Sequence, residues 1–146
     1  MTTYETNIVI AKSVDQVYQL ISNPDRACEW ITGLKKVELQ SGNASEIGSM
    51  TKYVFEERGK EVTFMEELLS ITPNAHFSFR LDSDQVVMES ETHLKAIGND
   101  NTEVMMSNAV AGKGFFMKLL MPLMKKSMIN RQQKDLFNLK GLLENE

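Results

Sequence analysis

Residues 114–146 read GFFMKLLMPLMKKSMINRQQKDLFNLKGLLENE, and they predict the element around which the rest of the chain folds. Apolar residues recur every three or four positions, the spacing of one face of an α-helix of roughly seven turns. That stripe is Met117, Met121, Met124, Met128, Gln132, Leu136, Leu139 and Leu143. The opposite face is apolar early, with Phe116, Leu120 and Leu123, and polar late. Pro122 removes one helix hydrogen bond, so we expect a kink near it.

The N-terminal part of the chain predicts one strand and two short helices. Thr3–Ala11 alternates, with Tyr4, Thr6, Ile8 and Ile10 on one face. Ser13 is placed as the cap of a helix that Asn23-Pro24-Asp25 ends, because proline disfavours a helical residue before it. A second short helix is expected at about Arg26–Thr32.

Alternating apolar and polar residues then predict strand after strand. The first of these strands is expected around Val37 and Leu39. The others are expected at Met50–Glu57, Lys60–Ile71, His76–Leu81, Val86–Ile97 and Thr102–Ala111. The turns Arg58-Gly59-Lys60 and Gly98-Asn99-Asp100-Asn101 are tight hairpin signals. Connections this short imply that neighbouring strands are antiparallel. The fold class is therefore α+β, with a curved antiparallel sheet of six to seven strands against the long C-terminal helix.

Composition limits the class of protein further. The 146 residues are expected to form a single domain, 1–146, because no linker or repeat divides them. Cys28 is the one cysteine, which excludes an internal disulfide. The start of the chain does not resemble a signal peptide, and the apolar stretch Gly114–Met124 is too short to span a bilayer, so we expect a cytoplasmic protein.

Charge is distributed unevenly along the chain. Residues 1–112 contain 9 Lys or Arg and 17 Asp or Glu, whereas residues 113–146 contain 7 and 3. An acidic body argues against nucleic acid as a partner. The basic residues of the final helix are interpreted as a solvated outer face.

Four short motifs, taken in order and spacing, carry a resemblance that covers essentially the whole chain. They are Ile10-Ala11-Lys12-Ser13-Val14 running into Val17, Asn23-Pro24-Asp25 leading to Trp30-Ile31, Glu66-Glu67-Leu68-Leu69-Ser70-Ile71-Thr72-Pro73, and Asp135-Leu136-Phe137-Asn138-Leu139-Lys140 closing with Leu142-Leu143-Glu144. With them the sequence resembles the SRPBCC, or START-like, superfamily and its polyketide cyclase/dehydrase-like branch. The resemblance implies the helix-grip fold, with a deep pocket between sheet and helix that holds hydrophobic ligands in relatives.

The candidate ligand-binding residues are those expected to line that pocket. The concave face of the sheet is aligned on Phe55, Phe79, Leu94 and Met106, which brings Tyr53, Ser90, Thr92 and Asn108 onto it. The helix contributes Met117, Met121 and Met124, since methionine fills irregular space. Trp30 is expected to pack over one end of the sheet, at the mouth of the cavity. Internal hydrogen bonding and ordinary core packing are the alternatives for the polar and the methionine sets.

Among ionisable groups, adjacent Glu66 and Glu67 must point to opposite faces of their strand, so one of them faces the concave side. Glu66 is taken as the site residue, although the sequence leaves the choice open. No metal site and no cofactor are expected, because neither His76 nor His93 has a ligand partner at metal-binding spacing. Catalytic residues stay unknown, and Gly112-Lys113-Gly114 lacks the spacing of a phosphate-binding loop.

Three functions remain open. The first is binding or carriage of a hydrophobic, lipid- or polyketide-like small molecule. The second is a cyclase or dehydratase in which Tyr53 and the inward-facing glutamate transfer protons. The third is a protein-interaction module that uses the final helix. The apolar segment Gly112–Met124 is interpreted as a mobile gate covered by the loop after Gly42, a second subunit in a homodimer, or a membrane that it contacts without stable insertion.

Overall fold

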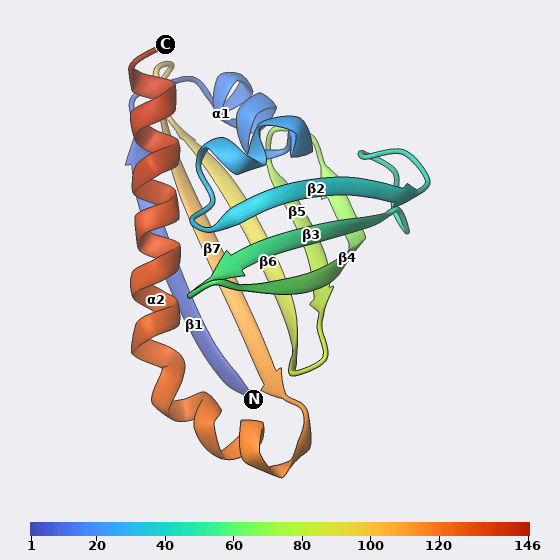
Figure 1. Ribbon diagram of the computed structural model, residues 1–146. Helices are drawn as coiled ribbons and strands as arrows, with labels where there is room; N and C mark the ends of the chain where they lie inside the picture. The colour runs from blue at the N-terminus through green and yellow to red at the C-terminus, as the bar shows by residue number, and fades with distance from the viewer.

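The computed structural model describes residues 1–146, and its elements follow the predicted order (Figure 1). The elements are β1 (Thr2–Ile10), α1 (Val14–Ile21), the 3₁₀ helix η1 (Pro24–Glu29), β2 (Leu34–Ser41), β3 (Met50–Glu57), β4 (Lys60–Thr72), β5 (His76–Asp82), β6 (Val86–Ile97), β7 (Asn101–Gly112) and α2 (Gly114–Glu144). Only the second short helix differs from its expected bounds by more than one residue, and it does so at both ends. The second short helix begins at Pro24, not Arg26, and ends before Trp30, because proline suits the first position of a helical turn.

The seven strands form one antiparallel sheet in the order β1-β7-β6-β5-β4-β3-β2. Strands β2 to β7 therefore form a continuous meander. Strand β1 pairs with β7 and forms one edge of the sheet. The predicted hairpin at Arg58-Gly59 is confirmed, since both residues have positive φ angles. The sheet curves so that β2, β3 and β4 cross in front of the other strands, while α2 lies along β1 and β7, as the helix-grip fold requires (Figure 1).

One face of the sheet, the concave face, is turned toward α2 and the two short helices. Its core cluster contains Ile10, Val17, Val104, Leu136 and Leu139, all fully buried. The other members of the cluster are Leu20, Ile21, Trp30, Phe77, Leu94, Met106 and Leu143. The second half of α2 thus anchors the helix to the sheet, and burial of these side chains is the main stabilising contribution.

The first half of α2 is much less covered. Met121, which is 4% exposed, is buried as expected for the stripe that faces the sheet, but Met124 is 39% exposed. Of the residues expected on the opposite face, Phe116 and Leu123 are exposed, whereas Leu120 is half-buried and Leu119 is the outward residue in its place. The helix is continuous through Pro122, and its N-terminal part bends away from the axis of the rest (Figure 1). A bend in this part of the helix agrees with the expected kink (Figure 1). Of the three expected covers, the loop after Gly42 is wrong, because the outward side chains are exposed to solvent.

The entry to α2 is tightly packed. A Cβ at Gly112 would lie 2.6 Å from the carbonyl carbon of Met117, so the strand backbone touches the first turn of the helix. Gly112, expected as the first residue of a mobile gate, is therefore a tightly packed position. Gly114, with φ +76°, makes the turn from strand to helix.

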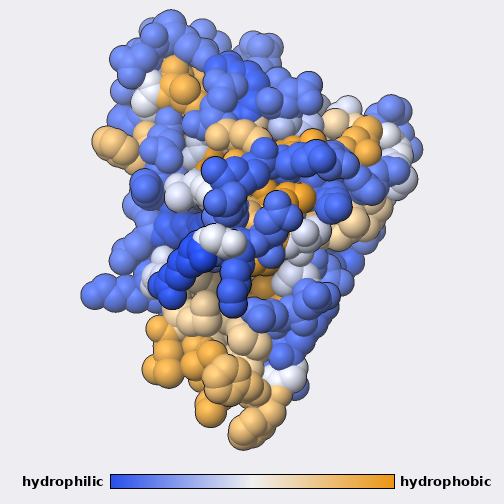
Figure 2. Space-filling view, viewed as in Figure 1, coloured by the Kyte–Doolittle hydropathy of each residue, from blue (hydrophilic) through white to orange (hydrophobic).

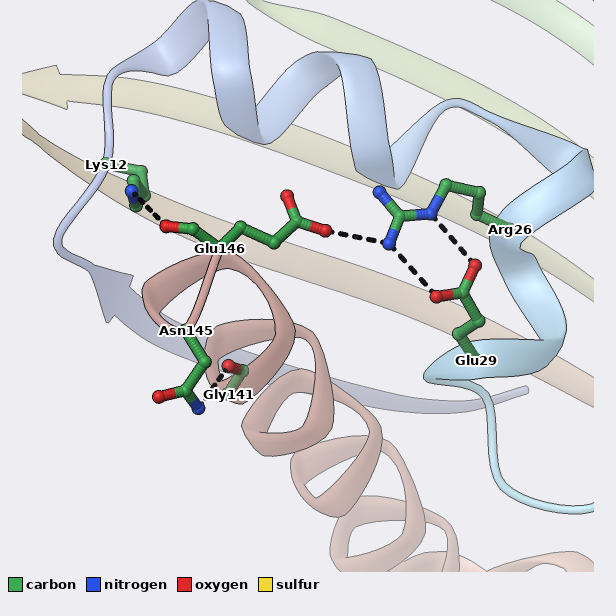
Figure 3. A network of polar contacts seen from close by, with 6 residues as sticks. All are labelled: Lys12, Arg26, Glu29, Gly141, Asn145 and Glu146. Carbon is green, nitrogen blue, oxygen red and sulfur yellow. Dashed lines mark hydrogen bonds and ion pairs between the residues drawn. The ribbon is translucent and has the colours of Figure 1, made fainter.

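The C-terminal end of α2 is held by polar contacts (Figure 3). The Arg26 guanidinium donates to the carboxylates of Glu29, at 2.8 and 3.0 Å, and Glu146, at 2.7 Å. The Lys12 ammonium reaches the Glu146 carbonyl at 3.4 Å. These contacts join the end of the chain to the loop after β1 and to η1. Neither α2 nor α1 has the length and continuous apolar character needed to cross a membrane.

Candidate functional site

Two titratable side chains meet on the concave face, where β3 pairs with β4. In the register of these strands Tyr53 faces Phe64, and Thr51 faces Glu66, so Tyr53 and Glu66 are on the same face and diagonal to each other. Glu67 points to the opposite, convex face, where it pairs with Arg80 at 3.3 Å. The choice that the sequence left open is therefore resolved in favour of Glu66.

The surroundings of this pair change its proton affinity. Burial raises the pKa of Glu66 from 4.5 to about 7, and a hydrogen bond with Tyr53 offsets part of that rise. Burial, and then the charge of Glu66, raise the pKa of Tyr53 well above its ordinary value. Near neutral pH the Glu66 carboxyl is therefore divided between its two protonation states, while Tyr53 keeps its proton.

Two aromatic rings lie next to Tyr53 on the same face of the sheet. Phe55 and Phe64 meet edge to face, with centroids 5.6 Å apart. Arg131 of α2 extends over Phe55, its guanidinium carbon 5.7 Å from the ring centroid, and donates to the Thr32 carbonyl at 2.9 Å. Arg131 also forms an ion pair with Glu57 at the end of β3. This arginine joins the long helix to the β2–β3 side of the sheet, next to the Tyr53–Glu66 pair.

A second polar group, on α2, is internally satisfied. The Gln132 carbonyl accepts from Thr6 at 2.6 Å and from Asn108 at 2.8 Å, and its amide donates back to Asn108 at 3.3 Å. Asn108 thus lies on the concave face as predicted, but its hydrogen bonds are used within the protein.

Three buried polar side-chain atoms have no hydrogen-bond partner within the protein. They are Trp30 Nε1, Thr32 Oγ1 and Thr92 Oγ1. Trp30 is only 7% exposed, and Thr92 is fully buried between Phe77 and Met106 in the strand register. Buried polar atoms in native proteins nearly always have a partner, so each of these atoms has unused hydrogen-bonding capacity.

Most of the other predicted residues lie in the core cluster or at its edge. Leu94, Met106 and Trp30 belong to the core cluster, where they pack with the anchored half of α2. Phe79 packs against the edge of that cluster and stacks on Phe77, with centroids 6.2 Å apart. Of the helix methionines, Met121 is buried and Met117 half-buried. The structure therefore brings Tyr53, Phe55 and Glu66 together as one group, places Trp30, Leu94 and Met106 in the core, and leaves Met124 outside both.

Two surface clefts lie elsewhere. One, of about 380 Å³, is lined mainly by convex-face residues of β1, β6 and β7, including Glu5, Glu89 and Glu91. The other, of about 480 Å³, lies at the β5–β6 turn beside Lys113. Neither is lined by Tyr53 or Glu66.

Sequence reasoning missed three functional candidates. Phe64 shares the alternation of Glu66 and could have been included from it, whereas the position of Arg131 depends on helix docking. His76 and His93 have no ligand partner at metal-binding spacing along the chain, but the sheet brings them together, so the expectation that they lack a partner was wrong. The two histidines are directly opposite each other on β5 and β6, with Glu91 beside them, and their ligand atoms lie within 4.8 Å of one another.

Comparisons with solved structures agree with this architecture. A protein from Thermus thermophilus superposes with a TM-score of 0.81 at 18% identity, over 99% of this chain and 98% of its own. The Zhui aromatase/cyclase from a Streptomyces species gives 0.82 at 12%, over 98% and 93%. A START superfamily protein from Mycobacterium smegmatis gives 0.81 at 17%, over 98% and 97%.

At the level of sequence, no curated protein matches the chain. The family model described as polyketide cyclase / dehydrase and lipid transport, however, matches residues 1–144. The resemblance that the four motifs suggested is thereby confirmed over nearly the whole length. The chain belongs to the polyketide cyclase / dehydrase and lipid transport family.

Proposed function

We propose that this protein binds a hydrophobic, lipid- or polyketide-like small molecule between the concave face and α2, with its polar end at Tyr53 and Glu66. The observation that carries the proposal is the placement of two titratable groups among aromatic rings on that face. A few polar groups in an apolar surround fix the orientation of a ligand, whereas apolar contacts supply most of the affinity. The unpartnered Trp30 and Thr92 atoms would satisfy further polar groups of the same molecule.

The test is uptake of a neutral apolar dye, N-phenyl-1-naphthylamine, followed by fluorescence, with displacement by palmitate and by 1-naphthol. Displacement by palmitate alone would indicate a lipid, and by 1-naphthol alone a polyketide-like ring. Phe64→Ala should weaken dye binding, because it removes one wall of the group around Glu66. Glu67→Gln, on the convex face, is the matched control and should bind as the wild type does. No uptake by the wild type, or equal uptake by Phe64→Ala, would refute the proposal.

A second function is favoured by the convergence of Tyr53 and Glu66 on one point. Ionised Glu66 can remove a proton from the carbon next to a carbonyl, and Tyr53 can donate its proton to a hydroxyl that leaves as water from the β-carbon. A carbon–carbon double bond forms as the C–H and C–O bonds break, which is the dehydration that completes an aldol-type cyclisation. Glu66 then returns its proton to the tyrosinate.

A dehydration assay separates the enzyme from the carrier. The substrate would be a β-hydroxyacyl thioester of N-acetylcysteamine with an aromatic acyl chain, and the readout its loss of water. Turnover should rise with pH through about 7, as Glu66 ionises, and should be lost in Tyr53→Phe and Glu66→Gln. A protein that binds the dye but shows no turnover above the buffer rate would be a carrier.

For the partner surface, we propose a transient contact of the first half of α2 with an anionic membrane. The apolar tip is defined as Phe115, Phe116, Leu119, Leu123 and Met124, which are between 39% and 83% exposed. Figure 2 shows this group as a continuous hydrophobic region at one end of the molecule. Lys118, Lys125 and Lys126 lie within the same segment, are exposed, and form no ion pair. Apolar side chains flanked by free lysines are complementary to anionic lipid.

Flotation with vesicles tests this contact. Binding to phosphatidylcholine vesicles that contain phosphatidylserine should fall with added salt and be lost in Phe116→Ser/Leu123→Ser. Pure phosphatidylcholine vesicles should bind much less. If the protein does not float but is dimeric by light scattering, and that variant is monomeric, the tip is a homodimer surface and the membrane proposal is wrong.

A further inference from the structure

The convex face of the sheet, away from the proposed ligand site, carries a group of metal-ligand side chains. His76, at the start of β5, is directly opposite His93 of β6 in the strand register. Their rings are adjacent and tilted by 36° to each other, with centroids 4.7 Å apart. Glu91, two residues before His93, is on the same face and approaches His93 Nε2 at 3.4 Å. One ligand atom from each residue lies within 4.8 Å of the others.

This arrangement has the geometry of a three-ligand site on a rigid sheet. Two ligands at alternate positions of one strand and a third directly across the neighbouring strand point the same way, since side chains on one face follow a period of two. Around a tetrahedral zinc ion, ligand atoms are about 3.3 Å apart, given metal–ligand distances of about 2.0–2.1 Å. The side chains of Glu91 and His93 are 58% and 47% exposed. Small rotations of these side chains can bring the ligand atoms, now within 4.8 Å of one another, to the separation of about 3.3 Å that zinc needs.

The surrounding charges also favour a cation. Glu91 lines the 380 Å³ cleft together with Glu5 and Glu89. The two nearest basic side chains are already opposite acids. Arg80 lies between Glu67 and Glu89, and Lys95 faces Glu103 across the β6–β7 pair.

We propose that His76, Glu91 and His93 form a binding site for a borderline divalent cation, with Zn²⁺ as the best match. Two imidazole nitrogens exclude Mg²⁺ and Ca²⁺ as preferred ions, because those prefer oxygen ligands. Three protein ligands leave the fourth position to water or to a carboxylate or imidazole from outside the chain. The ion would join β5 to β6 on the face opposite the ligand site, independently of the proposed function.

The experiment uses the full chain in a Cys28→Ser background, because Cys28 is exposed and its thiol would also bind zinc. Co²⁺ is titrated first, since a four-coordinate cobalt site absorbs visible light strongly, and Zn²⁺ is then used to displace it. One equivalent should bind. His76→Ala and His93→Ala should each weaken binding about tenfold or more, and Glu91→Gln by a smaller factor.

Glu89→Gln is the matched control, a carboxylate on the same strand and face that lies outside the group, and it should weaken binding much less than either histidine variant, because its charge acts only at a distance. Circular dichroism of each variant checks that it is folded, which these exposed positions should allow. The proposal is overturned if the parent takes up no zinc at concentrations on the order of 100 µM. It is equally overturned if both histidine variants bind zinc as tightly as the parent.

Discussion

Glu66 and Tyr53 lie diagonally on the same face of two antiparallel strands, whereas the next residue, Glu67, points to the opposite face. Burial keeps the pKa of Glu66 at about 7 in the folded protein, above the 4.5 of an exposed glutamate. Between these two pH values the folded state holds a proton that the unfolded state releases.

The stability of the protein should therefore fall as pH rises from about 4.5 to about 7. The stabilising effect of the neutral carboxyl is complete below pH 4.5 and lost above pH 7, with an amplitude of up to about 3 kcal/mol. Glu66→Gln should remove this part of the pH dependence, and Glu67→Gln should not. Urea unfolding at pH 5 and pH 8 gives the free energy of unfolding at each pH. An equal change in this free energy between the two pH values for the wild type and Glu66→Gln would contradict the prediction.

Strand periodicity made the Tyr53–Glu66 site predictable in part. Alternation puts Tyr53 and Phe55 on one face of β3, and the structure confirms that face. It could not show which of Glu66 and Glu67 shares it, because that depends on cross-strand register, which is set by the turn at Arg58-Gly59.

Features that depend on docking between distant elements were not predictable. The alternation of His93 with Glu91 was correct, but the pairing of His76 with His93 needs the β5–β6 register. Likewise, the helical spacing of apolar residues does not show which of Leu119, Leu120 and Leu123 is covered by the sheet. Only the angle at which α2 meets the sheet makes Leu120 half-buried and the other two exposed.

The two halves of α2 should respond differently to truncation. Leu139 is fully buried in the core cluster, so Leu139→Ala should cost about 2–5 kcal/mol. Leu119 is 62% exposed, and Leu119→Ala should change stability by no more than about 0.5 kcal/mol. Denaturant midpoints for both variants in one buffer decide this. A Leu119→Ala variant as unstable as Leu139→Ala would show that the apolar tip is covered in solution.

The contact between β7 and α2 predicts a severe effect of one methyl group. In Gly112→Ala the new Cβ would lie 2.6 Å from the Met117 carbonyl carbon, a backbone atom that cannot rotate away. Shifting the first turn of α2 should cost about 1–3 kcal/mol. Gly141→Ala, in the same helix with open space at its Cβ, is the control and should stabilise the protein by up to about 1 kcal/mol. Thermal unfolding should therefore move in opposite directions for the two variants.

The hydrogen bonds of Gln132 supply the final prediction. Its side chain satisfies Asn108, 4% exposed, and Thr6, 3% exposed, which have no other side-chain partner across the helix–sheet contact. Gln132→Leu should leave both groups buried without a partner, at about 1–3 kcal/mol for each group. The neighbouring Gln133 is exposed and bonds only to the Asn7 carbonyl, so Gln133→Leu should cost little.

A double variant shows whether the loss comes from the unpaired amide or from packing. Replacing both partners by apolar residues removes the unsatisfied groups, so Gln132→Leu/Asn108→Leu should recover part of the stability that Gln132→Leu loses. Free energies of unfolding for the wild type, the two single variants and the double variant give the coupling energy. If the losses simply add, the Gln132–Asn108 hydrogen bonds do not hold the middle of α2 to the sheet, and the helix is anchored by its leucines alone.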